Sequence, residues 1–253
     1  MYTMEAAMAK EMEFRELMAL AKDVLENDTP YYRNRNVIDA LFKLKPDLPY
    51  QEIVYVRLAV IDSFYSTNMK KHIGGMEELA KVIADMSEDD DDLKKKISQY
   101  KMSLNQPDIT DLFEKSFGSP SAKAPSLISK YFYFLTEHNF PIEDSLLKEN
   151  INRVLGFFGY EFPMHSKNEH KATLIGDLLK FEPIKDDYSS FDNLVWLYGK
   201  ISKKSFSLIM DNIKEKDAMR AKQTASKDLK KFWTYADKIT EEYNNNHPNQ
   251  KFK

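Results

Sequence analysis

The chain has 253 residues and a mass of 29.6 kDa, with 42% hydrophobic and 30% charged residues, which is typical of a folded globular protein rather than a disordered chain. It contains no Cys, and this excludes disulfides, zinc–thiolate sites, iron–sulfur clusters and a cysteine nucleophile. No apolar run approaches the roughly 18 residues of a membrane span, and the N-terminus lacks a secretory signal, so we expect a cytoplasmic protein with no membrane partner.

Apolar residues recur at helical spacing along most of the chain, and the alternation typical of strands is rare. The pattern predicts an amphipathic helix over residues 4–26, a region that Pro30 is expected to end. Further helices are predicted over 37–44, 50–65, 76–86, 93–101, 108–116, 125–135, 144–158, 174–180, 191–211 and 227–243.

An acidic run, Glu88–Asp92, is the densest cluster of charge. Adjacent carboxylates do not converge on one point, and metal-binding loops intersperse their ligands, so we interpret the run as the solvated start of a helix. His165 and His170 flank a polar loop without thiols or patterned carboxylates and are interpreted as surface residues. We expect neither a metal nor a cofactor.

These patterns predict an all-α multi-helix bundle. Its many short helices must pack against several neighbours, because none is long enough for a two-layer coiled coil. We expect residues 1–185 to form a helical core and residues 186–253 to form a basic helical extension packed on it. The protein is expected to act as a monomer.

Two segments carry more chemical information. In the first, an apolar helix runs into Ser66-Thr67-Asn68 and a new helix begins after Gly74-Gly75. In the second, Lys130 interrupts an aromatic helix, and Phe140-Pro141-Ile142-Glu143-Asp144 places a carboxylate at the start of the next helix.

In their order and spacing, these segments resemble the helix-hairpin-helix DNA glycosylases, especially the 8-oxoguanine DNA glycosylase branch, over roughly residues 48–155. The resemblance implies a helix-hairpin-helix fold and excision of a modified base from double-stranded DNA. It also implies DNA contacts at Ser66, Asn68, Lys70 and Lys71, with Asn68 filling the gap that an extruded base leaves. The family hairpin reads Gly-x-Gly, whereas Gly118-Ser119-Pro120-Ser121-Ala122 has one Gly, so phosphate binding by Gly118 and Ser121 is expected to be degenerate.

Cleavage of an N-glycosidic bond develops positive charge on the sugar, which an ionised carboxylate stabilises, and Asp144 is the predicted carboxylate. A lysine that attacks the sugar would add strand cleavage. Two lysines remain open for that role, because Lys123 lies 21 residues and Lys130 lies 14 residues before Asp144. Plain structural roles stand beside these: Asp144 as a helix N-cap, Lys130 reaching out to solvent, and Lys123 as a surface lysine.

The charge distribution favours contact with phosphates. Residues 200–253 carry 13 basic and 7 acidic side chains, whereas the rest of the chain carries 24 and 33. Lys227, Lys230 and Lys231 are therefore expected to contact DNA through a basic helix face. The alternative function is a non-catalytic all-α module that binds DNA or protein and keeps the scaffold without the activity.

Overall fold

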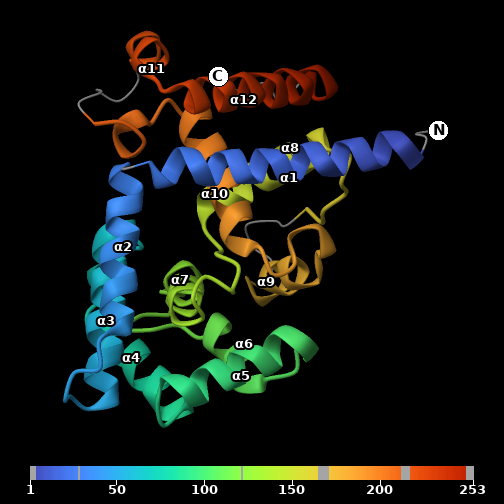
Figure 1. Cartoon of the computed structure of the whole chain (residues 1–253). Helices are drawn as coiled ribbons and strands as arrows, with labels where there is room; N and C mark the ends of the chain where they lie inside the picture. Colours follow the sequence, from blue (N-terminus) through green and yellow to red (C-terminus); the bar gives the residue numbers. More distant parts are fainter. Residues whose placement is uncertain (1–3, 28, 121, 165–170, 212–216, 249–253) are drawn as a thin grey trace. The chain divides into compact units, whose positions relative to one another are not determined.

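A computed structural model describes residues 4–27, 29–120, 122–164, 171–211 and 217–248 (Figure 1). Across these ranges the chain is helical and contains no strand, apart from one isolated bridge between Ser116 and Lys123. The predicted all-α multi-helix fold is therefore confirmed. No helix of the described residues combines the length and apolarity that crossing a bilayer requires.

Most predicted helices are present, with bounds shifted by a few residues at either end. The α-helices are α1 (Met4–Glu26), α2 (Pro30–Lys43), α3 (Tyr50–Tyr65), α4 (Gly75–Met86), α5 (Asp90–Ser103), α6 (Pro107–Glu114), α7 (Pro125–Leu135), α8 (Ser145–Phe157), α9 (Lys171–Lys180), α10 (Tyr188–Ser202), α11 (Ala218–Thr224) and α12 (Lys227–Asn246). Short 3₁₀ turns are η1 (Met69–Lys71), η2 (Glu182–Ile184) and η3 (Phe206–Leu208).

Three features differ from the sequence predictions. The helix predicted over 37–44 begins earlier, at Pro30, because proline fits the first turn of a helix, where its missing N–H is not needed. The helix predicted over 191–211 ends at Ser202 and is followed by η3. The short helix α11 was not predicted; it begins where the Asp217 side chain accepts the backbone N–H of Arg220.

The acidic run does start a helix, as predicted. The Asp89 carboxylate accepts the backbone N–H of Asp92 at 2.9 Å, and three further acidic residues occupy the first turn of α5. Carboxylates at this end of a helix interact favourably with its free N–H groups. The described residues contain no group of three or more His, Asp or Glu side chains arranged to hold a metal ion.

The chain divides into two compact units. Unit 1 comprises Met1–Arg33, Ser145–Met164 and Ser190–Lys253, and unit 2 comprises Asn34–Asp144 and His165–Ser189. Unit 1 thus joins the C-terminal helices to α1 and α8. The division into domains at residues 185 and 186 stays a prediction.

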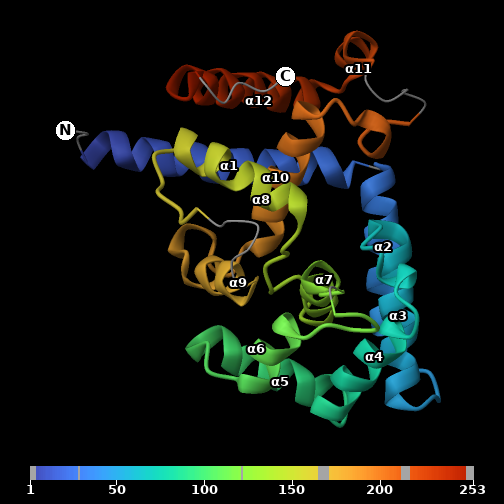
Figure 2. The same ribbon diagram turned by 180° about the vertical axis from the view of Figure 1, so that it is seen from behind.

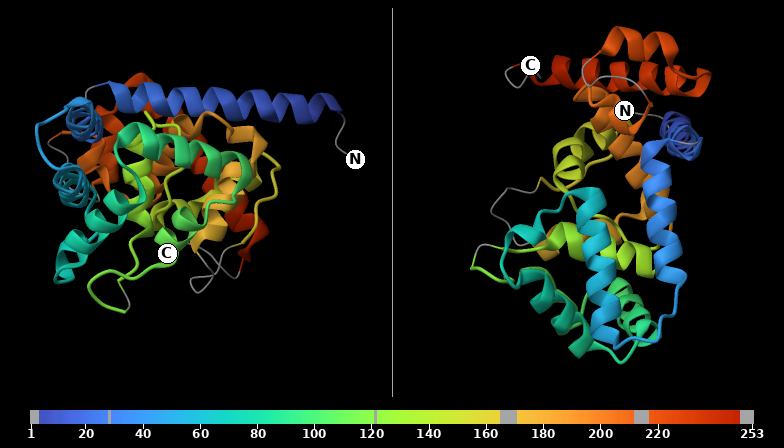
Figure 3. Two further views of the ribbon diagram at one scale, coloured as in Figure 1. Left: turned by 90° about the horizontal axis from the view of Figure 1, so that it is seen from below. Right: turned by 90° about the vertical axis from the view of Figure 1, so that its left-hand side faces the viewer.

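In unit 1, α1 is one unbroken helix (Figure 3) and packs with α12, which also packs with α8. Aromatic rings fill its core. The Phe14 ring lies 5.1 Å from Phe158 and 5.3 Å from Tyr160, and the Phe206 ring stacks on Trp233 at 5.1 Å. These large rings remove much apolar surface from water and hold segments that are distant in sequence together.

In unit 2, α7 is the central helix and packs with α3, α5 and α6 (Figures 1 and 2). Every α7 residue except Ser126 is buried. Such an all-round apolar helix is stable only inside a core. A charged side chain in this helix, Lys130, is therefore the feature that calls for a partner.

Candidate active site

Lys130 and Asp144 form an ion pair in unit 2. The Lys130 Nζ lies 3.2 Å from Asp144 Oδ2 and also donates to Ser126 Oγ at 2.9 Å. The Lys130 side chain is only 3% exposed, whereas that of Asp144 is 22% exposed. A buried ammonium is tolerated only when it is paired and hydrogen-bonded, and these two contacts meet that need.

The local fold explains why the two charges meet. Ser126 and Lys130 are four residues apart on α7 and therefore lie on one helix face. The chain then reverses after α7, and the backbone N–H of Glu143 donates to Ser129 Oγ at 3.0 Å. This bond holds the segment before Asp144 against α7, so the carboxylate is placed by backbone contacts as well as by its charge.

Tyr65, the last residue of α3, covers the lysine. The Lys130 Nζ lies 5.5 Å from the centre of the Tyr65 ring, and the same ring lies 6.2 Å from the Phe134 ring. Ring faces attract cations at this distance. The amine is thus enclosed by Ser126, Tyr65 and Asp144, and the carboxylate is the member of the pair that solvent reaches.

Lys123, the other candidate lysine, does not contact Asp144. Its Nζ lies 2.7 Å from Glu114 Oε2, and its side chain is 36% exposed. Of the two alternatives that the sequence left open, the structure brings Lys130 to Asp144.

The turn after α3 contains four predicted DNA-contact residues, all with exposed side chains: Ser66, Asn68, Lys70 and Lys71. Ser66 and Asn68 have left-handed backbone conformations, with φ of 52° and 67°. Asn68 Nδ2 donates to the Ser66 carbonyl at 2.9 Å. Their contact with DNA stays a prediction.

The hairpin after α6 packs against this turn. A Cβ added at Gly118 would lie 2.7 Å from the Ile73 carbonyl oxygen, so only glycine fits there. Ser119 Oγ lies 3.3 Å from His72 Nδ1. The two segments predicted to contact DNA therefore lie side by side.

The hairpin amides, however, are largely engaged within the protein. The Gly118 N–H donates to Glu78 Oε2 at 2.9 Å, and Pro120 has no N–H to offer. The Ala122 N–H donates to the Ser119 carbonyl at 3.0 Å. Ser121 lies outside the described residues. Phosphate binding by Gly118 would require Glu78 to leave, and contact of this hairpin with DNA stays a prediction.

A cavity of about 210 Å³ lies in unit 2 at the C-terminal end of α7. Two aromatic rings, Phe42 and Phe134, and two polar side chains, Asp39 and His138, are among the residues that line it. Phe134 also contacts Tyr65, and it lies one helical turn from Lys130 on the same face of α7. Lys130, Asp144 and Tyr65 are not among the lining residues, and the cavity is smaller than the ~300–1,000 Å³ of sites for drug-sized ligands.

Two hydrogen bonds to the His138 ring lie at the polar end of this cavity. Arg35 lies 2.8 Å from His138 Nδ1, and because arginine only donates, that nitrogen accepts. The proton of a neutral His138 is then on Nε2, 2.7 Å from Asp39 Oδ1. Asp39 is therefore held in place as a hydrogen-bond acceptor at the cavity.

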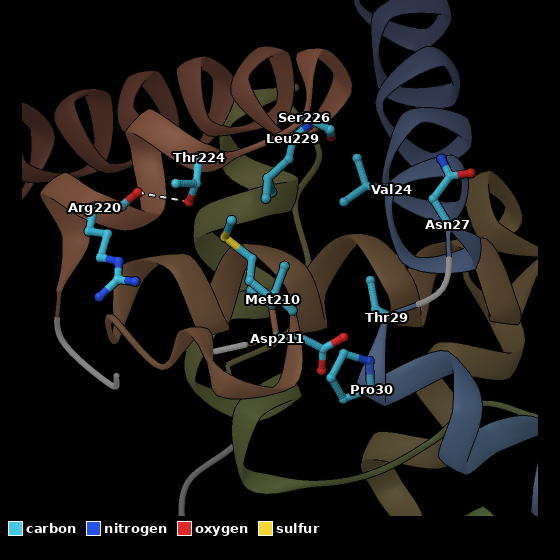
Figure 4. A pocket seen from close by; sticks show the side chains of 11 residues that line it. Val24, Asn27, Thr29, Pro30, Met210, Asp211, Arg220, Thr224, Ser226 and Leu229 are labelled. Carbon is cyan, nitrogen blue, oxygen red and sulfur yellow. Dashed lines mark hydrogen bonds between the residues drawn. The ribbon is translucent and has the colours of Figure 1, made fainter. Parts of the chain in front are cut away.

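Unit 1 has a larger cavity of about 400 Å³, shown in Figure 4. Its carboxylate, Asp211, is engaged by Arg33 at 2.8 and 3.0 Å, and no lysine–carboxylate pair lies among its lining residues. It offers no arrangement comparable to Lys130 and Asp144. Lys227, Lys230 and Lys231 lie in the first two turns of α12, all exposed.

Sequence reasoning missed three features of unit 2. Asp62 is a buried carboxylate that accepts hydrogen bonds from the turn after α3. Glu78 accepts the hydrogen bond of the Gly118 N–H. Ile73 is 96% exposed, next to that amide contact. A signal existed for Ile73, since an apolar residue between His72 and two glycines has no helix face to bury it.

Comparisons with protein-family models, with curated proteins and with solved structures yield no match.

Proposed function

We propose that this chain is a DNA N-glycosylase that removes a modified base from double-stranded DNA, with Asp144 as its catalytic carboxylate. The observation that carries the proposal is the ion pair itself, in which a partly solvent-accessible carboxylate is held by a buried lysine. Such a carboxylate is held in position before any substrate arrives. A fixed negative charge is what a developing sugar cation requires.

In the proposed reaction, the bond between C1′ and the base nitrogen breaks, and the base leaves with the bonding electrons. Positive charge develops on the sugar beside the Asp144 carboxylate. A water molecule adds its oxygen to C1′ and gives one proton to Asp144, which returns it to solvent, and the departing base takes one proton from solvent. The products are the free base and an abasic site.

Lys130 is proposed as the residue that positions Asp144, because its amine is the enclosed partner. Direct attack by Lys130 on C1′ would require the Tyr65 ring to move and the amine to lose a proton. The geometry therefore favours hydrolysis by water over a covalent lysine intermediate. Strand cleavage through a lysine is the less favoured variant of the same proposal.

The cavity of unit 2 supports a base-extrusion mechanism. Its two aromatic walls suit a planar ring, and the Asp39 carboxylate would accept a hydrogen bond from a base N–H. Phe134, which lines the cavity, contacts the Tyr65 ring and lies one helical turn from Lys130 on α7. Enzymes that act on bases extrude them from the stack into pockets of this kind.

The test is a base-release assay on a panel of duplexes, each containing one modified base, with borohydride present in a parallel reaction. We expect release of at least one base and no trapped protein–DNA adduct from the wild type. An adduct that Lys130→Gln removes and Lys123→Gln preserves would assign covalent attack to Lys130. No release from any duplex would overturn the proposed function.

A non-catalytic DNA-binding or protein-interaction module is the second candidate. The observation in its favour is the engagement of the Gly118 amide by Glu78, since a scaffold that keeps its shape without gripping DNA would tolerate this contact. A buried lysine–carboxylate pair also serves to fix one conformation of a core. This candidate predicts that Asp144→Asn changes stability and leaves DNA binding unaltered.

A further inference from the structure

Asp62 has an environment that the proposed reaction does not use. It lies in the last turn of α3 and is 1% exposed. A carboxylate at such a depth is costly unless its oxygens are satisfied by donors. The hydrogen-bond donors around the Asp62 carboxylate therefore indicate its structural role.

All the hydrogen bonds described for the Asp62 carboxylate come from the turn that follows α3. Oδ1 accepts from the Thr67 hydroxyl and from the Met69 backbone N–H, the latter at 2.9 Å. Oδ2 accepts from the Lys70 backbone N–H at 3.3 Å. One buried carboxylate thus holds three of the four turn positions 67–70, all except Asn68.

The turn needs such an anchor, because Ser66 and Asn68 are both non-glycine residues with positive φ. A left-handed conformation costs such residues roughly 1 kcal/mol each. Asp62 holds the neighbours of Asn68 while the Asn68 side chain remains exposed. The result is an exposed polar side chain, hydrogen-bonded to the Ser66 carbonyl, on a backbone that Asp62 holds from the buried side.

The same turn begins at Tyr65, whose ring covers Lys130. The position of Asn68 is therefore linked to the ion pair through three residues of ordered backbone. The Asn68 side chain would have to enter the DNA base stack while C1′ of the sugar lies beside Asp144. Its distance from the Asp144 carboxylate therefore matters, and the turn sets that distance.

We propose that Asp62 is a positioning residue for opening the DNA stack, holding the turn so that Asn68 fills the space of the extruded base. This inference rests on the proposed glycosylase function. Asp62 touches neither the substrate nor the reacting atoms. It acts through the turn, and its contribution is confined to substrates whose base is still stacked and paired.

The test compares single-turnover base release from two substrates: a fully paired duplex, and the same strand with the base in a three-nucleotide unpaired bubble. Asp62→Asn keeps the size of the side chain but presents an amide NH₂ to backbone N–H donors. Thr67→Val removes one donor without altering the charge. Asp85→Asn is the control, because Asp85 is an exposed carboxylate on α4 paired with Lys81.

We expect Asp62→Asn to slow release from the paired duplex on the order of 10- to 100-fold and from the bubble by no more than about twofold. Thr67→Val should show a smaller loss with the same selectivity, and the control should match the wild type on both substrates. Equal losses on both substrates would mean that Asp62 only supports the fold. Unchanged rates, or a wild type that releases the base from the duplex but not from the bubble, would also overturn the inference. A wild type inactive on both would overturn the proposed function itself.

Discussion

The buried middle of α7 and the hairpin that precedes it each contain a lysine paired with a carboxylate. The hairpin pair is the shorter, with 2.7 Å between Lys123 and Glu114 against 3.2 Å between Lys130 and Asp144. The surroundings differ far more than the distances. Water can replace Glu114 as a partner of Lys123, whereas the enclosed amine of Lys130 depends on Asp144 and Ser126.

This difference teaches that separation alone does not rank ion pairs. Exposed pairs contribute about 0–1 kcal/mol to stability, because solvent screens them and both side chains lose freedom. Loss of one partner from a buried pair leaves a charge without compensation and is much more damaging. The comparison predicts that changes around α7 have large effects and equivalent changes in the hairpin have small ones.

The largest expected effect is that of Asp144→Asn on base release. The amide keeps the size of the side chain but not the charge that stabilises the sugar cation, so the barrier should rise by about 3–4 kcal/mol. The single-turnover rate measures this. Glu114→Gln removes the carboxylate charge that pairs with Lys123 and should leave the rate within about twofold. An equal loss of rate in both variants would contradict the difference between the two ion pairs.

The next effect concerns stability. Lys130→Met should lower the free energy of unfolding by about 2 kcal/mol, because the Ser126 hydroxyl loses its lysine donor and Asp144 loses its contact with the Lys130 ammonium at a partly buried site. Lys123→Met should change it by less than about 0.5 kcal/mol. Urea unfolding of the two variants measures the difference, and similar values would show that burial does not separate the pairs.

A third effect should appear at alkaline pH. Burial, assisted by the charge of Asp90, raises the pKa of Tyr131, next to Lys130 on α7, well above the value of about 10 found in unfolded chains. Above pH 10 the unfolded chain loses the phenol proton while the folded chain keeps it, so stability falls by about 1.4 kcal/mol per pH unit for this group. Burial also raises the pKa of Tyr50, which adds a similar slope.

Tyr131→Phe should therefore reduce the loss of stability between pH 10 and 11 by about 1 kcal/mol, as measured by urea unfolding at several pH values. An unchanged slope would show that the Tyr131 phenol does not contribute to alkaline unfolding.

The smallest effect is expected in the hairpin. Glu78→Gln keeps an acceptor for the Gly118 N–H and removes a negative charge that would repel a phosphate, so affinity for duplex DNA should rise about two- to fivefold at low salt. Glu77→Gln, on the adjacent exposed position of α4, is the control. Equal affinities in both variants and the wild type would place the hairpin away from DNA.

The sequence predicted the features that depend on neighbouring residues and missed those that depend on contacts between distant residues. The bounds of α3 and α7 were predicted closely, because prolines and apolar runs mark them within a few residues. The pairing of Lys130 with Asp144 was left open, since it depends on a chain reversal that Ser129 stabilises from within the core. Glu78 and Gly118 are 40 residues apart, and no local pattern announces such a contact. Asp62 was overlooked because a single acid in an apolar helix gives no sign of the turn it holds.

The enclosure of Lys130 also affects how readily its amine is chemically modified over time. Reducing sugars and aldehydes dissolved in water react with primary amines that they can reach, and Lys123 presents such an amine. Lys130 lies 5.5 Å from the centre of the Tyr65 ring and 3.2 Å from Asp144, and its side chain is only 3% exposed. Slow glycation should therefore modify exposed lysines before Lys130. The positive charge beside Asp144 should then persist longer than the charges of the exposed lysines.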